Sequence, residues 1–549
     1  MEVAAARARA RWIPAVRSSP LGWTAAAIVL VAVLTMPIAV VALGALKPAG
    51  EAWGHVVRTL LPGYVWHTII LAVGAGGLAT VIGVSCAWLV AMCEFPLRRF
   101  FRWALVLPLA IPAYTAAYTY VGMFDVTGPV QRIVRAVMPG GQDAFIYWNV
   151  MRIEVLAALF GLVLYPYIFL LTRTFFEHRT GPALEASRLL GRGPWSVFLR
   201  IALPLARPAV AGGLFLVLME ILNDYGAVAY YGVTTFTTGI FRSWFSLGDL
   251  DSAIRLAAVL MLGVFVAMAI ERWQRAGARY DDDGPARPVA RYRLRGVKAA
   301  AAAACCTVPL LFGFILPVGQ LAIWTMRALP DASWIALYTL ARNSFGLAAG
   351  AAALCVLVAI VLVYAGRLDY SRLASSITKL ALLGYSVPGA VIAVGVLVTA
   401  ITVDRALTGG ARLILTGGLG LLVFAYVVRF MAVAYLSVES GFARVGPEFG
   451  GAARTLGAGP FRTLLSVELP MLRRTLLAAG TLVFVDVMKE LPLTLILRPF
   501  NFDTLATRAF QLASDEQLVQ SAPAALLIIA TATVGVALLQ SGIYSAESR

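Results

Sequence analysis

Two pairs of acidic side chains stand inside stretches of sequence that are otherwise almost entirely apolar. Glu220 and Asp224 form the first pair, and Asp486 and Glu490 form the second, with Lys489 beside them. The pairs match at a constant offset of 266 residues, and their i, i+4 spacing predicts that both carboxyl groups of a pair lie on one helix face. A carboxylate within a membrane span is costly and usually faces an aqueous cavity or a partner, and its oxygen atoms suit a hard cation. We therefore expect these five residues to line a translocation path or to form its gate.

A structural role for the same acids is the alternative. They could form ion pairs with Arg207, Lys489 or a neighbouring helix, or they could cap helix ends near the outer surface. The five cysteines show no metal-binding spacing and the three histidines are scattered, so the sequence supports no resident metal site. No nucleophile with a base partner stands out either, so we expect no catalytic residue in this chain.

The composition places the chain in a membrane. Of its 549 residues, 60% are hydrophobic and only 13% are charged, whereas about a quarter of the residues of a soluble domain are charged. The formal net charge of +17 comes almost entirely from arginines that lie in short loops between apolar stretches. Such arginines are explained by the orientation of membrane spans, so we expect a lipid environment and no nucleic-acid partner.

The apolar segments number twelve, and each is near the roughly 20 residues that a helix needs to cross the hydrocarbon core. They predict an all-α polytopic membrane protein. The polar linker 271–298 separates two groups of six, which gives a first half at 1–280 and a second half at 281–549. Arginine-rich loops follow every second span, so the positive-inside rule predicts that both termini are cytoplasmic. The segments lie at approximately 23–46, 65–92, 101–124, 153–175, 209–229, 252–270, 299–326, 344–365, 377–401, 413–436, 475–497 and 522–541.

One polar loop occurs twice, at 182–204 and at 447–470. At the same offset of 266 residues, Ala186 matches Ala452 and Gly191 matches Gly457. Each copy predicts a short helix that ends at a glycine able to take a positive φ, followed by a Gly-Pro turn and a second amphipathic segment. Two equivalent polar elements between membrane spans indicate two equivalent docking points for a symmetric partner.

A loop that begins Glu-Ala-Ala, continues to a glycine and ends in Leu-Pro resembles the "EAA" cytoplasmic loop of ABC-transporter permeases. The first copy keeps Glu185 but has Ser187 as its third residue, and the second copy has Gly451 in place of the glutamate. The resemblance implies a fold like that of type I ABC importer permeases, with two pseudo-symmetric halves. It assigns coupling to the ATPase to Glu185, Ala186, Arg188, Leu190 and Gly191 in the first loop, and to Ala452, Arg454, Leu456 and Gly457 in the second.

Two further stretches resemble the fused permeases of ferric-iron ABC importers. One is DVMKELPLTLILRPFNFDTLATR, at Asp486–Arg508, and the other is its first-half equivalent NDYGAVAYYGVTTFTTGIFRSWF, which begins at Asn223. The resemblance implies an inner-membrane permease that moves ferric iron to the cytoplasm by ATP-driven alternating access. It also implies two copies of an ABC ATPase subunit, which bind ATP and Mg, and a periplasmic or lipid-anchored substrate-binding protein.

Other cargoes and another class of transporter remain open. Related permeases for thiamine, polyamines or an oxyanion share these loops, and a secondary transporter without an ATPase also has repeats and intramembrane acids. The duplicated docking loop favours the importer, because a secondary transporter has no use for it. A phosphate-binding P-loop needs a lysine directly after a glycine, and none of the four lysines follows one. We therefore expect a transport subunit, not an enzyme, with no cofactor of its own.

Overall fold

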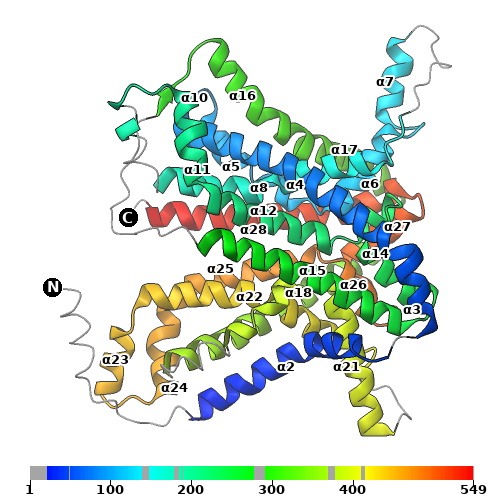
Figure 1. Cartoon of the computed structure of the whole chain (residues 1–549), viewed down its shortest axis with the longest axis vertical. Helices are drawn as coiled ribbons and strands as arrows, with labels where there is room; N and C mark the ends of the chain where they lie inside the picture. The colour runs from blue at the N-terminus through cyan, green and yellow to red at the C-terminus, as the bar shows by residue number, and fades with distance from the viewer. Residues whose placement is uncertain are drawn as a thin grey trace.

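The computed structural model describes residues 21–48, 50–138, 148–178, 185–187, 189–276, 291–368, 378–409 and 415–547, and these are almost entirely helical (Figure 1). Within these ranges the strands are β1 (Cys93–Glu94) and β2 (Tyr292–Arg293), which pair in parallel. The pair ties the end of one long helix of the first half to the segment that leads into the second half. The predicted boundary between residues 280 and 281 lies outside the described residues and stays a prediction.

The helices of the first half include four long ones joined by short turns. They are α2 (Leu21–Ala45), α3 (Glu51–His55), η1 (Val56–Leu60), α4 (Leu61–Met92), α5 (Arg98–Ala104), η2 (Leu107–Ala110), α6 (Ala113–Phe124), α7 (Pro129–Val137), α8 (Ile153–His178), α10 (Pro194–Val197), η4 (Phe198–Ala202), α11 (Leu203–Leu205), α12 (Arg207–Asn223), α13 (Gly226–Tyr230), α14 (Phe236–Phe241), η5 (Arg242–Ser246) and α15 (Leu250–Ala276).

The helices of the second half follow a similar order. They are α16 (Val297–Leu310), η6 (Leu311–Ile315), α17 (Leu316–Ala328), η7 (Leu329–Asp331), α18 (Trp334–Leu368), α20 (Leu383–Ser386), α21 (Gly389–Thr408), α22 (Leu419–Val445), α23 (Glu448–Thr455), α24 (Pro460–Thr463), η8 (Leu464–Glu468), α25 (Leu469–Met488), α26 (Pro492–Leu497), α27 (Leu505–Ser514) and α28 (Leu518–Glu547).

Membrane-crossing helices dominate the structure. Nine helices within the described ranges are long and apolar enough to cross a membrane, and two bent helix pairs raise this number to eleven when each pair counts as one span. The helix at the place of predicted span eleven, α25, has 20 residues but carries Arg473, Arg474 and Asp486, which makes it less apolar than the others. The predicted all-α polytopic class is confirmed.

Prolines break the third span of each half at matched places. Pro112 precedes α6 and Pro388 precedes α21, and both have extended backbone, with ψ of 137° and 144°. A proline disfavours helical backbone in the residue before it, and Ile111 and Val387 are accordingly extended. In the first half the helical segments on the two sides of this break are bent by 90°. These breaks direct the starts of α6 and α21 toward the centre of the molecule.

The first helix of each half packs against the other half. Helix α2 contacts α18 and α21 of the second half as well as α15 of its own. In the same way α16 contacts α4, and α17 contacts α6 of the first half and α28 of its own. Because each half holds a helix of the other, the two halves form one continuous apolar core.

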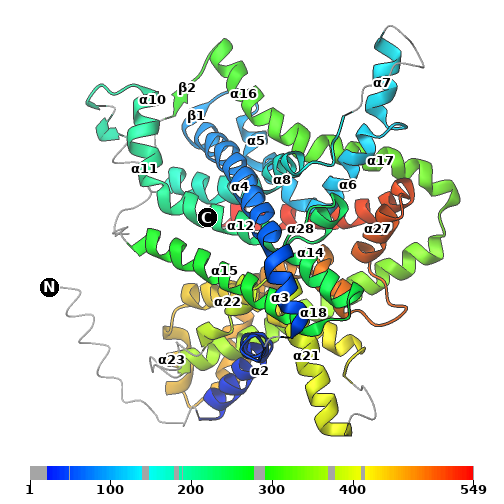
Figure 2. The same ribbon diagram turned by 45° about the vertical axis from the view of Figure 1, so that its right-hand side comes forward.

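The two repeated loops lie at the same end of the molecule. Figures 1 and 2 show α10 and α11 of the first loop and α23 of the second at the left, and α27 on the other side of the molecule. The loops therefore face one compartment, and α27 lies toward the opposite one.

Candidate functional site

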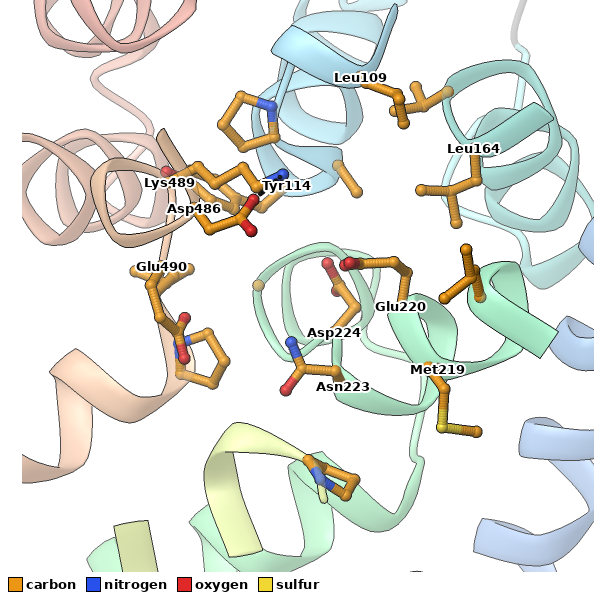
Figure 3. Close-up of a pocket in the computed structure, with 18 of the residues that line it drawn as sticks. Leu109, Tyr114, Leu164, Met219, Glu220, Asn223, Asp224, Asp486, Lys489 and Glu490 are labelled. Atoms are coloured by element: carbon orange, nitrogen blue, oxygen red, sulfur yellow. Dashed lines mark ion pairs between the residues drawn. The ribbon is translucent and has the colours of Figure 1, made fainter. Parts of the chain in front are cut away.

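The five predicted path residues meet in one cavity of about 100 Å³ between α12 and α25 (Figure 3). Helices α6, α8 and α22 complete its wall, together with the break between α20 and α21. Figure 3 shows Glu220 and Asp224 on one side of the cavity and Asp486, Lys489 and Glu490 on the other. The cavity thus lies where the two halves meet, and the acids of both halves line it.

The prediction that each acid pair lies on one helix face is wrong. Helix α12 ends at Asn223, and Asp224 has extended backbone with ψ of 129°. Helix α25 ends at Met488, so Glu490 also lies beyond the helix. Local chemistry explains both breaks, because an aspartate favours capping over helix continuation and Pro492 cannot continue a helix. The second acid of each pair therefore stands at a helix break inside the protein.

Both of these acids cap the short helix that follows the break. Asp224 Oδ1 accepts hydrogen bonds from the backbone N–H groups of Ala227 at 2.8 Å and Val228 at 3.3 Å. Glu490 Oε1 accepts a bond from the N–H of Leu493 at 3.2 Å, the position that matches Ala227. These bonds satisfy backbone donors that the start of a helix leaves unpaired. The capping alternative is thus observed, although inside the protein, and one carboxyl group can cap a helix and line a cavity together.

The acids of the second half are paired with cations. Lys489 Nζ lies 3.0 Å from Asp486 Oδ1, and Arg429 Nε lies 3.8 Å from Glu490 Oε1. The Arg429 guanidinium also donates a 3.0 Å hydrogen bond to the carbonyl of Val387 at the proline break of α21. The two cations therefore hold α25, α22 and α21 together around the cavity.

The acids of the first half have only neutral partners. Glu220 Oε1 accepts a 3.1 Å hydrogen bond from the hydroxyl of Tyr167, and Asp224 caps α13. Among the described residues, no cation lies within ion-pairing distance of either carboxyl group. At the offset of 266 residues, Asn223 occupies the position of Lys489 and Val163 that of Arg429. The acids are duplicated, but the cations belong to the second half alone.

Asn223 joins the two halves at the edge of the cavity. Its Oδ1 accepts a 2.6 Å hydrogen bond from the backbone N–H of Gly389, the first residue of α21. A β-carbon at Gly389 would lie 2.7 Å from Glu490 Oε1, so only glycine permits this approach. The close approach of α21 to α12 and to the break after α25 encloses the cavity.

Sequence reasoning missed three polar residues of this cavity. Arg429, Tyr167 and Asn223 all line it. Arg429 had a readable signal, because it stands alone as a cation within an apolar span, and such residues usually have an assigned partner. Arg207, proposed as a possible partner of the acids, begins α12 and lies about 20 Å along the helix from Glu220.

The repeated loops have the predicted local structure. Gly191 and Gly457 both take a positive φ, of +76° and +86°. The N–H of Arg192 donates to the carbonyl of Ser187, and the N–H of Ala458 donates to that of Ala453, which is the pattern of a helix ended by a left-handed residue. Helices α10 and α24 then begin at Pro194 and Pro460. Residues 182–184 and Arg188 lie outside the described residues.

The coupling residues predicted in these loops are accessible to a partner. Leu190 is 81% exposed and its match Leu456 is 88% exposed. Two aromatic residues at matched positions, Trp195 and Phe461, are also exposed. Glu185, Ala186, Gly191, Ala452, Arg454 and Gly457 are exposed as well. Apolar side chains at matched positions outside the spans present a two-fold related surface.

A buried acid supports the second loop from below. Glu468 is buried, with its Oε1 3.9 Å from an Arg367 guanidinium nitrogen. Burial raises the pKa of the Glu468 carboxyl, and the nearby Arg367 and Arg454 oppose this shift. Arg367 also donates hydrogen bonds to the carbonyls of Phe442 at 2.7 Å and Gly446 at 2.8 Å. These contacts fix the angle at which the loop leaves α22.

Comparison with known proteins agrees with this architecture. A 26% identical relative, the Fe(3+)-transport system permease protein FbpB 2 of Haemophilus influenzae, aligns over 486 residues, which are 86% of this chain and 88% of the relative. The probable ABC transporter permease protein y4fN of Sinorhizobium fredii is 24% identical over 80% of this chain and 79% of its own length. The molybdenum transport system permease protein ModB of Escherichia coli is 24% identical over 38% of this chain and 92% of its own length.

The family model of binding-protein-dependent transport system inner membrane components matches the chain twice, at residues 79–280 and 363–543. Each match contains one repeated loop and one acid pair, in agreement with the duplication seen in the sequence. The chain therefore belongs to the family of binding-protein-dependent transport system inner membrane components, with two permease halves fused in one polypeptide.

Proposed function

We propose that this chain is the membrane-spanning subunit of an ATP-driven importer whose cargo is ferric iron. The cargo arrives on an external binding protein, passes between the two halves and enters the cytoplasm. A relative named as a Fe(3+)-transport permease aligns over 86% of this chain, including both loops and both acid pairs. The relationship at this identity supports the cargo, and the cavity supports its sign of charge.

The paired loops are the observation that carries the ATP-driven mechanism. They lie at one end of the molecule, end their short helices with the same glycine geometry and expose matched apolar side chains (Figure 1). Two copies of one ATPase subunit fit such a surface, because equivalent loops need equivalent grooves. In this proposal that end of the molecule is cytoplasmic, and both termini are cytoplasmic as well.

The charge of the cavity favours a cation. Its lining includes four carboxyl groups but only two cationic side chains, and each of these cations already faces a carboxylate. In a site shielded from water, charges interact far more strongly than in bulk solvent. Molybdate or sulfate would meet the free carboxyl groups of the first half without a free cation. A trivalent iron cation or its partly hydrated form would be attracted.

The second half supplies the gate in this proposal. The pairs Asp486–Lys489 and Glu490–Arg429 hold the wall of the cavity closed, while Glu220 and Asp224 lower the barrier for the entering cation. Opening the interface separates α12 from α25 and breaks the bond between Asn223 and Gly389. The site lacks the convergence of a tight metal site, which suits a path that must release its cargo.

Two measurements on intact cells and purified protein test this proposal. Uptake of radioactive iron, with and without this chain, tests the cargo, and molybdate, sulfate and thiamine uptake in the same cells serve as controls. Copurification of an ATPase with the tagged chain tests the energy source. Iron uptake that is unchanged without the chain would exclude iron as cargo, and purification without any ATPase would favour a secondary transporter.

A further inference from the structure

A second hollow opens on the side of the molecule away from the loops. It has a volume of about 730 Å³ and is lined by residues of α13, α14 and η5 from the first half and of α26 and α27 from the second. We call this hollow the vestibule. Both halves contribute the same elements to it, so it lies on the pseudo-twofold axis that also relates the loops.

Two matched arginines face the vestibule, one from each half. Arg242 and Arg508 stand at the offset of 266 residues, both line the hollow, and both are exposed. In the described part of the chain neither makes an ion pair with a carboxylate. Arg498 also lines the vestibule but is paired with Asp503, and Asp515 is the one carboxylate in the lining. The vestibule therefore presents a surplus of positive charge in a two-fold related arrangement.

Aromatic rings separate the vestibule from the acidic cavity. Tyr225 stacks on Phe241 with ring centres 3.6 Å apart, and Phe510 lies 6.0 Å from Tyr225. Phe510 also meets Tyr114, a residue of the cavity wall, edge to face at 6.2 Å. The floor of the vestibule is thus closed by packed rings. A bare cation gains nothing from this basic surface, so the arginines must serve an acidic partner that stays outside.

We infer that the binding protein docks on the vestibule through acidic side chains, with one carboxylate reaching Arg242 and another reaching Arg508. This inference rests on the proposed function, because the family depends on a binding protein and the opposite end of the molecule is assigned to the ATPase. A protein that spans both arginines contacts both halves at once. Docking can therefore be sensed by η5 and α27, whose aromatic residues form the floor above the cavity.

Exposed complementary charges act mainly on the rate of association, and their effect falls with ionic strength. The permease is therefore reconstituted in nanodiscs with its ATPase, and the binding protein of the same transport system is added. Association is measured by surface plasmon resonance at low and at physiological salt. We expect Arg242→Glu with Arg508→Glu to slow association by roughly tenfold or more at low salt, and to abolish stimulation of ATP hydrolysis by the binding protein.

Matched variants separate charge from folding. Arg242→Lys with Arg508→Lys keeps both charges and is expected to retain most of the association rate. Arg132→Glu, on α7, reverses an exposed charge on a helix that projects away from the vestibule in Figure 1 and is expected to change little. Basal ATP hydrolysis and copurification of the ATPase report separately on the proposed function.

Two results would overturn the inference while leaving the importer intact. One is an unchanged association rate in the charge-reversed protein that still hydrolyses ATP. The other is a calorimetric signal from citrate or inorganic phosphate that disappears in the same variant, without any effect on the binding protein. The second result would assign the vestibule to a small anion.

Discussion

Arg429 Nε and Glu490 Oε1 lie 3.8 Å apart in the wall of the cavity, and the first half has no equivalent of this pair. Glu490 matches Asp224, whereas Arg429 matches Val163. Both partners are largely buried, and a buried charge that loses its partner is strongly unfavourable. The duplicated acids of this permease are therefore not equivalent, and their neutralisation should have different consequences.

Neutralising the paired acid is expected to loosen the gate. In Glu490→Gln, Arg429 loses its counter-charge, at a cost of about 3 kcal/mol or more for the closed cavity. We expect basal ATP hydrolysis, measured on the purified complex without binding protein, to rise several-fold. Asp224→Asn is the matched control, since its carboxyl group has no cation to release, and basal hydrolysis should stay at the parental rate. Equal basal rates in both variants would show that the pair does not hold the closed state.

Neutralising the unpaired acid is expected to slow the cargo. Glu220→Gln removes a negative charge but keeps an oxygen that can accept the hydrogen bond from Tyr167. Iron uptake into proteoliposomes should fall several-fold, while basal and stimulated ATP hydrolysis stay near the parental values. Tyr167→Phe removes the hydrogen bond and keeps the charge, so it should transport nearly normally. Normal uptake by Glu220→Gln would remove this carboxylate from the path.

Much of the coupling surface could be predicted because it depends on local chemistry. A helix that ends at Gly191 or Gly457 follows from the glycine and the turn behind it, and the structure confirms a positive φ at both. The cavity was harder to predict, because its geometry depends on where helices stop. The i, i+4 rule assumes a continuous helix, and the capping of α13 by Asp224 breaks that assumption. Arg429 comes from a distant span, so no local pattern pairs it with Glu490.

The glycines that end the loop helices provide a test of coupling. Gly191→Val with Gly457→Val places β-carbons at positive φ, at a cost of roughly 1–2 kcal/mol each. No atom lies within 4 Å of either β-carbon, so the strain is confined to the backbone of the loop. We expect assembly without coupling, so that ATP hydrolysis continues while uptake is lost.

The neighbouring glycines give the control for this loop variant. Gly193 and Gly459 have negative φ, of −71° and −67°, and equally open surroundings. Gly193→Val with Gly459→Val should therefore transport normally. Coupled transport by the Gly191 and Gly457 double variant would show that the loops tolerate a different exit angle.

Reporter fusions test the orientation of the chain. Fusions after Arg102 and after Arg295 should both report the cytoplasm, because α5 and β2 lie toward the end of the molecule that carries the first repeated loop (Figure 2). A fusion within α7, for example after Arg132, should report the opposite compartment. A periplasmic signal after Arg102 or Arg295 would contradict the proposed topology and would place the loops on the wrong side for an ATPase.

The asymmetry of the cavity can be tested by copying the second half into the first. Asn223→Lys introduces the residue that stands at the matched position 489, three residues after Glu220, and the new ammonium should pair with that carboxylate as Lys489 pairs with Asp486. The cavity would then hold three cations against four acids, and no strongly attractive carboxylate would remain except the helix-capping Asp224. We expect iron uptake to fall by roughly tenfold, which corresponds to about 1.4 kcal/mol at the barrier. Asn223→Leu is the control, because it removes the same hydrogen bond to Gly389 without adding charge. If both variants lose uptake equally, contact between the halves at Gly389 limits transport and the charge does not; if only the lysine variant loses it, the unpaired acids of the first half attract the cargo.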